Sequence, residues 1–488
     1  MSPRALLRLA ELVGIEPQCT DALGQTRQAS AETLLALIGA FGLRPDAVPP
    51  EAGIGNGNRA RPFGLGPTHI VHAEDPLPVL TVRLPPGARD IAWRCRLEHG
   101  EERSGAAPAQ AAAQGVFSLP LPAELPLGYH RLAISAAGIA AEIGLIVAPS
   151  RCYLPPQLEP GARSWGLTCQ LYGLRSARNW GVGDLTDLAE LARAAGGCGA
   201  ATLGLNPLHA RFAAEPLHVS PYSPSSRTRL DYLAIDPTAV PGFAEDETVR
   251  ALMAGEWFAA TRGAARAAAL VDYGAVAACK RPVLEALFAR FRKVELDAGG
   301  AACTELGRSF RQFQQRAGQA LSDFAVFEAL HEHHCSTGLG FSWRGWPLPM
   351  RNPRSDGVAE FAAAHRERVE LFEFLQWEAD RQLATAAAAG RAYGLTIGLY
   401  RDLAVGADPS GAEAWADQEL VVPCASIGAP PDALSRAGQD WGLAPVNPLI
   451  LRHQGFAPFI ACLRASMRHA GILRIDHVMS LSRLYWIP

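Results

Sequence analysis

The pattern of hydrophobic and polar positions changes along the chain, and each pattern predicts a different kind of structure. Residues 4–13 and 30–42 carry apolar side chains at helical spacing, so they predict two short helices. Residues 69–148 contain short alternating or apolar runs bounded by proline and glycine, a pattern typical of antiparallel strands. We therefore expect a helical segment and linker over residues 1–60 and a β-sandwich domain over residues 61–150.

Six short runs are the expected strands of the sandwich. They are Ile70–His72, Val79–Leu84, Ile91–Leu97, Val116–Leu121, His130–Ala136 and Ala140–Val147. Residues 44–68 and Pro149–Gly161 are rich in proline and glycine, so both are interpreted as linkers. Gly53-Ile-Gly-Asn-Gly57 has the spacing of a phosphate loop, but no strand precedes it and no helix follows it, so we interpret it as linker too.

Beyond residue 160 strand-like and helix-like stretches alternate. Trp165–Leu171 predicts a buried strand, Asp184 is placed to cap the helix that follows, and Ala200–Asn206 predicts the next strand. Such a strand–helix–strand unit implies parallel pairing. Two further strands are expected at Leu395–Tyr400 and Ile472–Asp476.

The stretches between these strands differ in composition. Amphipathic, alanine-rich segments predict a helical insertion over about residues 238–345, and residues 359–393 predict a long helical stretch. Residues 404–447 are interpreted as a long loop region rich in glycine and proline, and Phe456–Ala470 as a helix.

The composition of the chain argues against nucleic-acid-binding and membrane proteins. The net charge is −3, from 45 basic and 48 acidic residues, so the balance gives no electrostatic signal for nucleic acid. No apolar run is long enough to span a membrane, and Arg8 and Glu11 interrupt the only candidate for a signal peptide. Ten scattered cysteines without a CxxC pair are typical of reduced thiols. We therefore expect a cytoplasmic protein without nucleic-acid or membrane partners.

The strand expected near the end of the chain carries the first candidate chemistry. Leu473 and Ile475 alternate with Arg474 and Asp476, so the two charged side chains share one face. A neighbouring arginine favours the ionised form of an aspartate, and an ionised carboxylate is what a glycosyl-transferring nucleophile needs. A structural ion pair at a strand end is the alternative that the spacing leaves open.

Other candidate residues lie at strand ends and in loops. Asp402 follows a strand at the same edge as Asp476, which favours a site because barrel sites draw on several strand ends. Tyr222 and Trp441 lie in polar loops, where an aromatic ring is either a hydrophobic anchor or a platform for a sugar.

Two motifs with the appearance of metal sites have simpler interpretations. His331-Glu-His-His-Cys335 ends in cysteine where the zinc helix HExxH needs a second histidine, so a helix end is the better interpretation. Asp408-Pro-Ser-Gly411 is too short for a calcium loop and predicts a turn. We expect no metal and no cofactor.

Several segments taken together resemble a known family. They are Asn179-Trp-Gly-Val-Gly-Asp-Leu-Thr-Asp-Leu188, Ser220-Pro-Tyr-Ser223, Gly398-Leu-Tyr-Arg-Asp-Leu-Ala-Val-Gly406, Ala425-Ser-Ile-Gly-Ala-Pro-Pro431, Gln439-Asp-Trp-Gly442 and Leu473-Arg-Ile-Asp-His477. The chain resembles the amylomaltases, the 4-α-glucanotransferases of glycoside hydrolase family 77. The N-terminal pieces are similar to the extra domains of the bacterial maltose-system members.

The resemblance implies an α/β fold, a (β/α)8 TIM barrel with inserted helical subdomains over residues 160–488. It also implies transfer of α-1,4-glucan segments between maltooligosaccharides by a retaining double displacement. Asp476 matches the family's nucleophile and Arg474 the arginine that holds it. The remaining matches are substrate-binding residues: Asp402 at the donor site, Tyr222 as a stacking platform, Trp441 in a loop over the cleft and His477 as a hydrogen-bond donor.

The chain also departs from the family. The general acid/base of the family is a glutamate in a Glu-Asp-Leu-Gly motif after the nucleophile strand, and Pro488 comes before any such motif. Only four of eight barrel strands can be counted. We therefore expect the first part of a longer protein, inactive by itself. The alternatives are a non-catalytic α-glucan-binding fragment and an α-amylase-like glycoside hydrolase.

Overall fold

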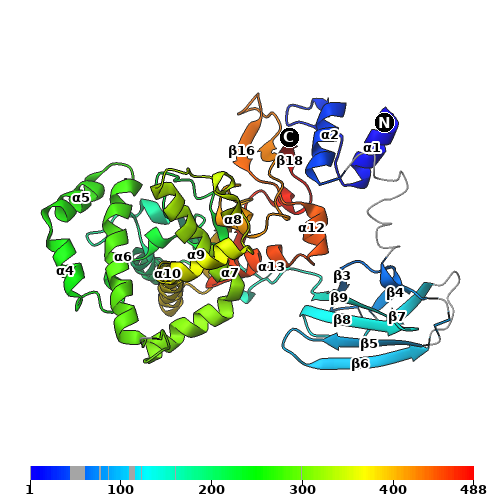
Figure 1. Cartoon of the computed structure of the whole chain (residues 1–488), viewed down its shortest axis with the longest axis horizontal. Helices are drawn as coiled ribbons and strands as arrows, with labels where there is room; N and C mark the ends of the chain where they lie inside the picture. Colours follow the sequence, from blue (N-terminus) through cyan, green and yellow to red (C-terminus); the bar gives the residue numbers. More distant parts are fainter. Residues whose placement is uncertain are drawn as a thin grey trace.

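The computed structural model describes residues 2–43, 61–75, 78–85, 87–88, 90–108, 116–122, 124–159, 161–297 and 299–488. Within these ranges the chain forms a small N-terminal helical piece, a β domain, and an α/β domain with a large helical subdomain (Figure 1). The glycine-rich segment 53–57 and most of the linker expected over residues 44–68 lie outside the described residues.

The N-terminal piece consists of two helices and a hairpin. Its elements are α1 (Pro3–Leu12), β1 (Gln18–Thr20), β2 (Thr26–Gln28) and α2 (Ala31–Ala40). Both predicted helices are confirmed. Ser30 caps α2 as predicted, because its Oγ accepts a hydrogen bond from the Thr33 amide at 3.1 Å. Gly42 follows the end of α2 with a φ of +74°, a conformation that glycine adopts without strain.

The described residues of the β domain form seven strands. They are β3 (Thr68–His72), β4 (Val79–Arg83), β5 (Asp90–Arg96), β6 (Glu102–Pro108), β7 (Val116–Pro120), β8 (Gly128–Ala136) and β9 (Ile139–Ala148). A five-stranded sheet has the order β3-β9-β8-β5-β6, and β4 pairs with β7. All six predicted strands are confirmed. Strand β6 was missed, and the expected antiparallel pairing is wrong for one pair, because β3 runs parallel to β9.

Four parallel strands form the sheet of the α/β domain. In order across the sheet they are β10 (Gly166–Cys169), β11 (Thr202–Leu205), β14 (Gly398–Leu403) and β17 (Ala470–Ile475). The predicted strands are confirmed, but β14 extends further than expected and includes Asp402. The prediction that the first strand is buried is wrong, because Trp165 and Leu167 at this edge of the sheet are 51% and 43% exposed.

The first helix of the α/β domain, α3 (Leu185–Gly197), is fixed by a buried ionic network. Asp184 caps it as predicted, and Asp187 completes a capping box. Arg178 forms ion pairs of 2.6–2.7 Å with Asp184, Asp187 and Asp236. The network therefore holds the first strand–helix turn in place. The two aspartates of this turn are both engaged in these structural contacts.

The helical subdomain covers one side of the molecule (Figure 1). Its helices are α4 (Glu247–Ala254), α5 (Glu256–Ala267), α6 (Tyr273–Glu295), α7 (Glu305–Ser336), α8 (Leu348–Arg351), α9 (Asp356–Ala364) and α10 (Arg366–Ala392). They enclose the largest hydrophobic core of the described residues. His331 is buried in that core, and its Nε2 lies 3.0 Å from the Phe341 carbonyl oxygen. His331 thus has a structural role in the core, which agrees with the interpretation of its motif as a helix end.

The segment expected to be a long loop contains regular structure. It holds α11 (Ala412–Ala416), β15 (Ser426–Ala429) and β16 (Gln439–Leu443), and it leads into α12 (Pro448–His453) and α13 (Ala457–Met467). The pair β15–β16 and the late strand β18 (Tyr485–Ile487) form an antiparallel sheet in the order β16-β15-β18. The loop prediction is wrong for these strands because their apolar positions are too few to give a periodic signal. Phe41 stacks on Trp486 at 5.2 Å, which joins the N-terminal helices to this sheet (Figure 1).

No helix in the described ranges has the length and apolar character that crossing a membrane requires.

Candidate functional site

The candidate residues meet at the carboxyl-terminal edge of the parallel sheet. Asp402 on β14 is the register partner of Arg474 on β17, so the two side chains start from adjacent positions. Asp476 directly follows β17, and its amide donates a hydrogen bond to the Leu403 carbonyl oxygen at 3.1 Å. The parallel pairing therefore brings together residues that lie 72 positions apart in the chain.

Arg474 connects the two carboxylates. Its Nη1 lies 2.5 Å from Asp402 Oδ2, and its Nη2 lies 2.7 Å from Asp476 Oδ1. Charge-assisted hydrogen bonds of this length are the strong ones, and the planar guanidinium fixes the angle between the two acceptors. The sequence placed Arg474 beside Asp476 alone, whereas the structure makes it the bridge between both acids.

Asp402 is the buried member of this group. Its side chain is 3% exposed, whereas that of Asp476 is 14% exposed. Burial raises the pKa of the Asp402 carboxyl above its ordinary value, although Arg474 and the Tyr222 hydroxyl oppose the shift. Asp402 Oδ1 has no hydrogen-bond partner among the described residues. This oxygen atom is itself buried, so its missing partner is an energetic cost and not a contact that is open to a ligand.

Tyr222 reaches the same acid from a loop. The loop runs between β12 (His209–Ala210) and β13 (Ser226–Leu230). The Tyr222 hydroxyl donates to Asp402 Oδ2 at 3.1 Å, while the residue remains 40% exposed. The hydroxyl group is therefore anchored and much of the side chain stays accessible, as a stacking platform requires.

Trp441 and His477 form the other end of the site. Trp441 lies on β16, and its ring centroid is 4.4 Å from that of His477. His477 has a left-handed backbone conformation, with a φ of 45°, immediately after Asp476. His477 Nε2 lies 3.6 Å from Asp476 Oδ2. The six residues singled out in the sequence are thus brought together in one place.

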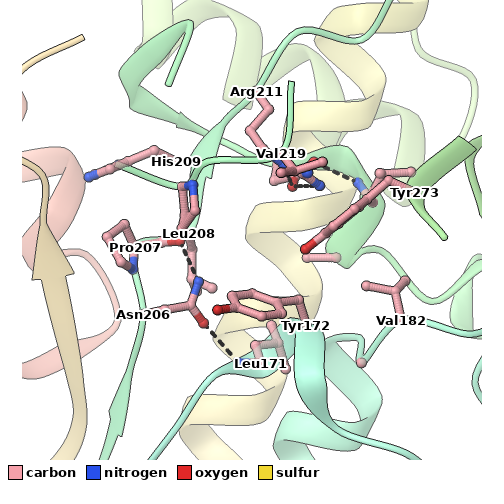
Figure 2. Close-up of a pocket in the computed structure, with 15 residues that line it drawn as sticks. Leu171, Tyr172, Val182, Asn206, Pro207, Leu208, His209, Arg211, Val219 and Tyr273 are labelled. Atoms are coloured by element: carbon pink, nitrogen blue, oxygen red, sulfur yellow. Dashed lines mark hydrogen bonds and ion pairs between the residues drawn. The ribbon is translucent and has the colours of Figure 1, made fainter. Parts of the chain in front are cut away.

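The structure also forms a pocket from residues that are not among the six candidates. A pocket at the ends of β10 and β11 is lined by Tyr172, Asn206, His209, Arg211 and Tyr273, among others (Figure 2). In Figure 2 Asn206 and His209 approach it from one side and Tyr273 from the other. The signal for two of these residues is their position, since Asn206 ends the predicted second strand and His209 lies in the segment that follows it.

Charge pairs hold the walls of this pocket. Arg211 Nη2 lies 2.7 Å from Asp231 Oδ2, and its guanidinium lies 4.2 Å from the centre of the Tyr273 ring. The His209 Nε2 accepts a hydrogen bond from the Ala404 amide at 3.2 Å. Burial lowers the pKa of His209 well below its ordinary value, so this imidazole is neutral and serves as an acceptor.

The described residues contain no group of three or more histidine, cysteine, aspartate or glutamate side chains that could hold an ion. The side chains that meet at this site are two carboxylates, one guanidinium and exposed aromatic rings, which suit carbohydrate binding and glycosyl transfer.

Comparison with known proteins agrees with this chemistry. Residues 169–488 match the family model described as 4-alpha-glucanotransferase, and residues 64–149 match the MalQ N-terminal beta sandwich domain. The 4-alpha-glucanotransferase of Mycobacterium tuberculosis is 35% identical over 510 residues, which covers 99% of this chain and 67% of that protein. The enzyme of Haemophilus influenzae is 37% identical over 377 residues, covering 76% and 53%.

A solved structure extends the likeness to the fold. The amylomaltase from Corynebacterium glutamicum matches with a TM-score of 0.80 at 30% identity, covering 100% of this chain and 67% of that one. The predicted fold class, a TIM-barrel-type α/β domain preceded by a β-sandwich, is confirmed. Because the family model matches residues 169–488, the chain belongs to the 4-alpha-glucanotransferase family, glycoside hydrolase family 77.

Proposed function

We propose that this site binds an α-1,4-glucan and that Asp476 takes a glucan segment from it as a covalent glycosyl-enzyme, for transfer to a second maltooligosaccharide. One observation carries the proposal, a continuous line of contacts among the candidate residues. In order along this line they are Tyr222, Asp402, Arg474, Asp476, His477 and Trp441.

Asp476 is suited to nucleophilic attack through one of its two oxygens. Arg474 binds Oδ1, whereas Oδ2 lies 3.6 Å from His477 Nε2, a longer and weaker contact. We assign Oδ2 as the attacking atom. It forms a bond to the anomeric carbon as the glycosidic C–O bond breaks and the leaving oxygen takes a proton from an acid. The 4-hydroxyl group of the acceptor then attacks the anomeric carbon, Asp476 leaves as a carboxylate, and the conjugate base of that acid takes the hydroxyl proton, so two inversions give net retention.

The other residues of the line are assigned to sugar binding. Tyr222 offers an exposed ring to the apolar face of a glucose unit, and Asp402 is assigned to the same donor-side subsite because it accepts the hydrogen bond of the Tyr222 hydroxyl group. Trp441 and His477 lie beyond Asp476, where they are placed to contact the sugar on the far side of the scissile bond. Arg474 keeps the two acids in a fixed mutual geometry.

Tyr222→Ala is expected to weaken binding of maltohexaose to this chain about tenfold, because a stacking surface next to Asp402 is lost. Isothermal titration calorimetry gives the dissociation constants. Tyr222→Phe is the matched control, since it keeps the ring and removes the hydroxyl group that donates to Asp402. We expect it to change the affinity less than about threefold. An unchanged affinity in Tyr222→Ala contradicts the stacking role.

The 488-residue chain by itself is expected to leave the chain lengths of maltotriose unchanged. Retaining transfer needs a second carboxyl group that gives and takes a proton, about 5–5.5 Å from the nucleophile. In the described part of the chain, the carboxylate linked to Asp476 through Arg474 is Asp402, and both Arg474 and Tyr222 donate to it. Asp402 therefore acts as a hydrogen-bond acceptor and does not serve as the second carboxyl group, the one that gives and takes a proton.

The products of this incubation separate the candidate functions. Redistributed chain lengths would contradict the expectation of inactivity. New reducing ends and free glucose without longer products would favour an α-amylase-like hydrolase, because transfer conserves reducing ends. Binding of maltooligosaccharides without either change would favour a non-catalytic glucan-binding role.

We also infer that the protein works in the cytoplasm, since all ten cysteines are free thiols, as a reducing compartment would keep them. The catalytic unit is assigned to residues 160–488, with residues 238–345 as its insertion.

A further inference from the structure

The loop that carries Tyr222 is attached to the strand that carries Asp402 by more than the Tyr222 hydroxyl group. We call residues 211–225, between β12 and β13, the Tyr222 loop. Because Tyr222 is 40% exposed, its own packing does not fix the ring. The position of the ring therefore depends on how the Tyr222 loop is held.

Asp408, in the segment after β14, binds the Tyr222 loop on both sides of Tyr222. Its Oδ2 accepts a hydrogen bond from Ser223 Oγ at 3.2 Å and lies 3.2 Å from His218 Nε2. Its amide donates to the Pro224 carbonyl oxygen at 2.8 Å. Residues four positions before and one position after Tyr222 thus meet at a single carboxylate oxygen.

The Asp408 carboxylate is itself well fixed. Its Oδ1 accepts a hydrogen bond from the Ser410 amide at 2.8 Å, and the Gly411 amide closes the predicted turn on the Asp408 carbonyl oxygen at 3.0 Å. The side chain is only 13% exposed. Partial burial strengthens charge-assisted hydrogen bonds, so the contacts of the Asp408 carboxylate with the Tyr222 loop are stronger than the same contacts on an open surface.

The base of the Tyr222 loop has anchors that do not involve the Asp408 side chain. Ser225 Oγ accepts a hydrogen bond from the Ala412 amide at 3.0 Å, and Arg227 pairs with Glu413. A Cβ added at Gly411 would lie 2.6 Å from the Ser225 Cα, so the two segments are in close contact there. Removing the Asp408 carboxylate should therefore release the tip of the loop while its base stays in place.

We propose that Asp408 is a positioning residue that sets the Tyr222 ring over the sugar-binding site. The proposal rests on the role of Tyr222 in the proposed function. Asp408 itself does not touch the substrate. It acts by holding the Tyr222 loop in the conformation in which the ring stacks, so that this ordering is complete before the glucan binds.

The test compares maltohexaose affinity in four forms of the full chain: wild type, Asp408→Ala, Tyr222→Ala and the double variant. Asp408→Ala is expected to raise the dissociation constant roughly three- to tenfold, the range expected when a ring and its loop must be ordered on binding. In the Tyr222→Ala background the same change is expected to have no further effect, because Asp408 acts through the ring.

Asp21→Ala is the matched control. Asp21 also accepts hydrogen bonds from backbone amides of a turn and pairs with a cation, Arg27, but it lies in the N-terminal piece. It is expected to leave the affinity unchanged. An equal loss of affinity from Asp408→Ala with and without the Tyr222 ring would overturn the proposal, and so would no loss in either background.

Hydrogen–deuterium exchange of residues 213–225 tests the positioning without a ligand. Asp408→Ala is expected to speed exchange in this segment, whereas Asp21→Ala is not. Unchanged exchange in Asp408→Ala would overturn the proposal even if the affinity fell. If the wild type binds no maltohexaose but exchange responds as expected, the proposed function fails while Asp408 remains the residue that orders the loop.

Discussion

Asp476→Asn is expected to abolish the covalent adduct that this chain forms with α-maltosyl fluoride. Fluoride leaves without taking a proton, so this donor needs a nucleophile but no general acid. Asp476 Oδ2 attacks the anomeric carbon, the C–F bond breaks, and a maltosyl ester remains on the enzyme. The uncharged amide of asparagine lacks that nucleophilicity, and we expect the rate of labelling to fall by at least about a thousandfold.

Mass spectrometry of the peptide that contains Asp476 measures the adduct. Asp440→Asn is the matched control, because Asp440 is an exposed carboxylate next to Trp441 that accepts from Ser426 Oγ and the Gly442 amide. It is expected to leave labelling unchanged. Adduct formation in Asp476→Asn, an adduct on Asp402, or no adduct in the wild type would each contradict the assignment of Asp476 as nucleophile.

Glu328→Gln is expected to stabilise the protein at pH 8.5 much more than at pH 5. Glu328 lies on α7, is 1% exposed, and accepts a hydrogen bond from the Ala213 amide at 3.1 Å. Burial raises its pKa from 4.5 to about 8. The folded chain therefore keeps this proton at pH values where the unfolded chain has released it.

The sign of the pH effect follows from this difference in bound protons. The contribution of Glu328 to stability is fully present below about pH 4.5, declines as the pH rises, and is lost above about pH 8. At about 1.4 kcal/mol per pH unit the total change is roughly 3–5 kcal/mol. Glutamine stays neutral throughout, and its carbonyl oxygen can still accept from the Ala213 amide.

Urea unfolding of wild type and Glu328→Gln at the two pH values measures this effect. The difference between the two proteins isolates one residue from all other titrating groups. Glu247→Gln, at a glutamate whose side chain is 93% exposed, serves as the control and is expected to change stability little at either pH. A Glu328→Gln difference that is the same at pH 5 and pH 8.5 would show that this carboxyl group is not held protonated.

Some predictions failed because a local pattern does not say what covers an element. The apolar run at the first barrel strand predicts burial, yet Trp165 and Leu167 lie at the edge of the sheet and are exposed. Strand β6 was missed because alternation alone finds a strand only when one face is strongly apolar, and the half-buried positions of β6 are Arg103, Gly105 and Ala107. Strands β15 and β16 are short, so their pairing with each other and with β18 decides their structure.

The sequence by itself determined the order and parallel pairing of the four barrel strands, and it singled out the six candidate residues. Helical and strand periodicities, caps and turn residues are local, so they can be seen without knowing the fold. The family resemblance then connected separate motifs to one activity. That was enough to place Asp402 and Asp476 at the same edge of one sheet.

Only the tertiary structure decided how the site is joined together. Arg474 bridges to an acid 72 residues away, and the Tyr222 hydroxyl group binds an acid 180 residues away. Asp408, which the sequence shows only as a turn, holds His218 and Ser223 on either side of Tyr222. Such contacts depend on strand register and on how loops pack, and neither of these produces a periodic pattern in the amino-acid sequence.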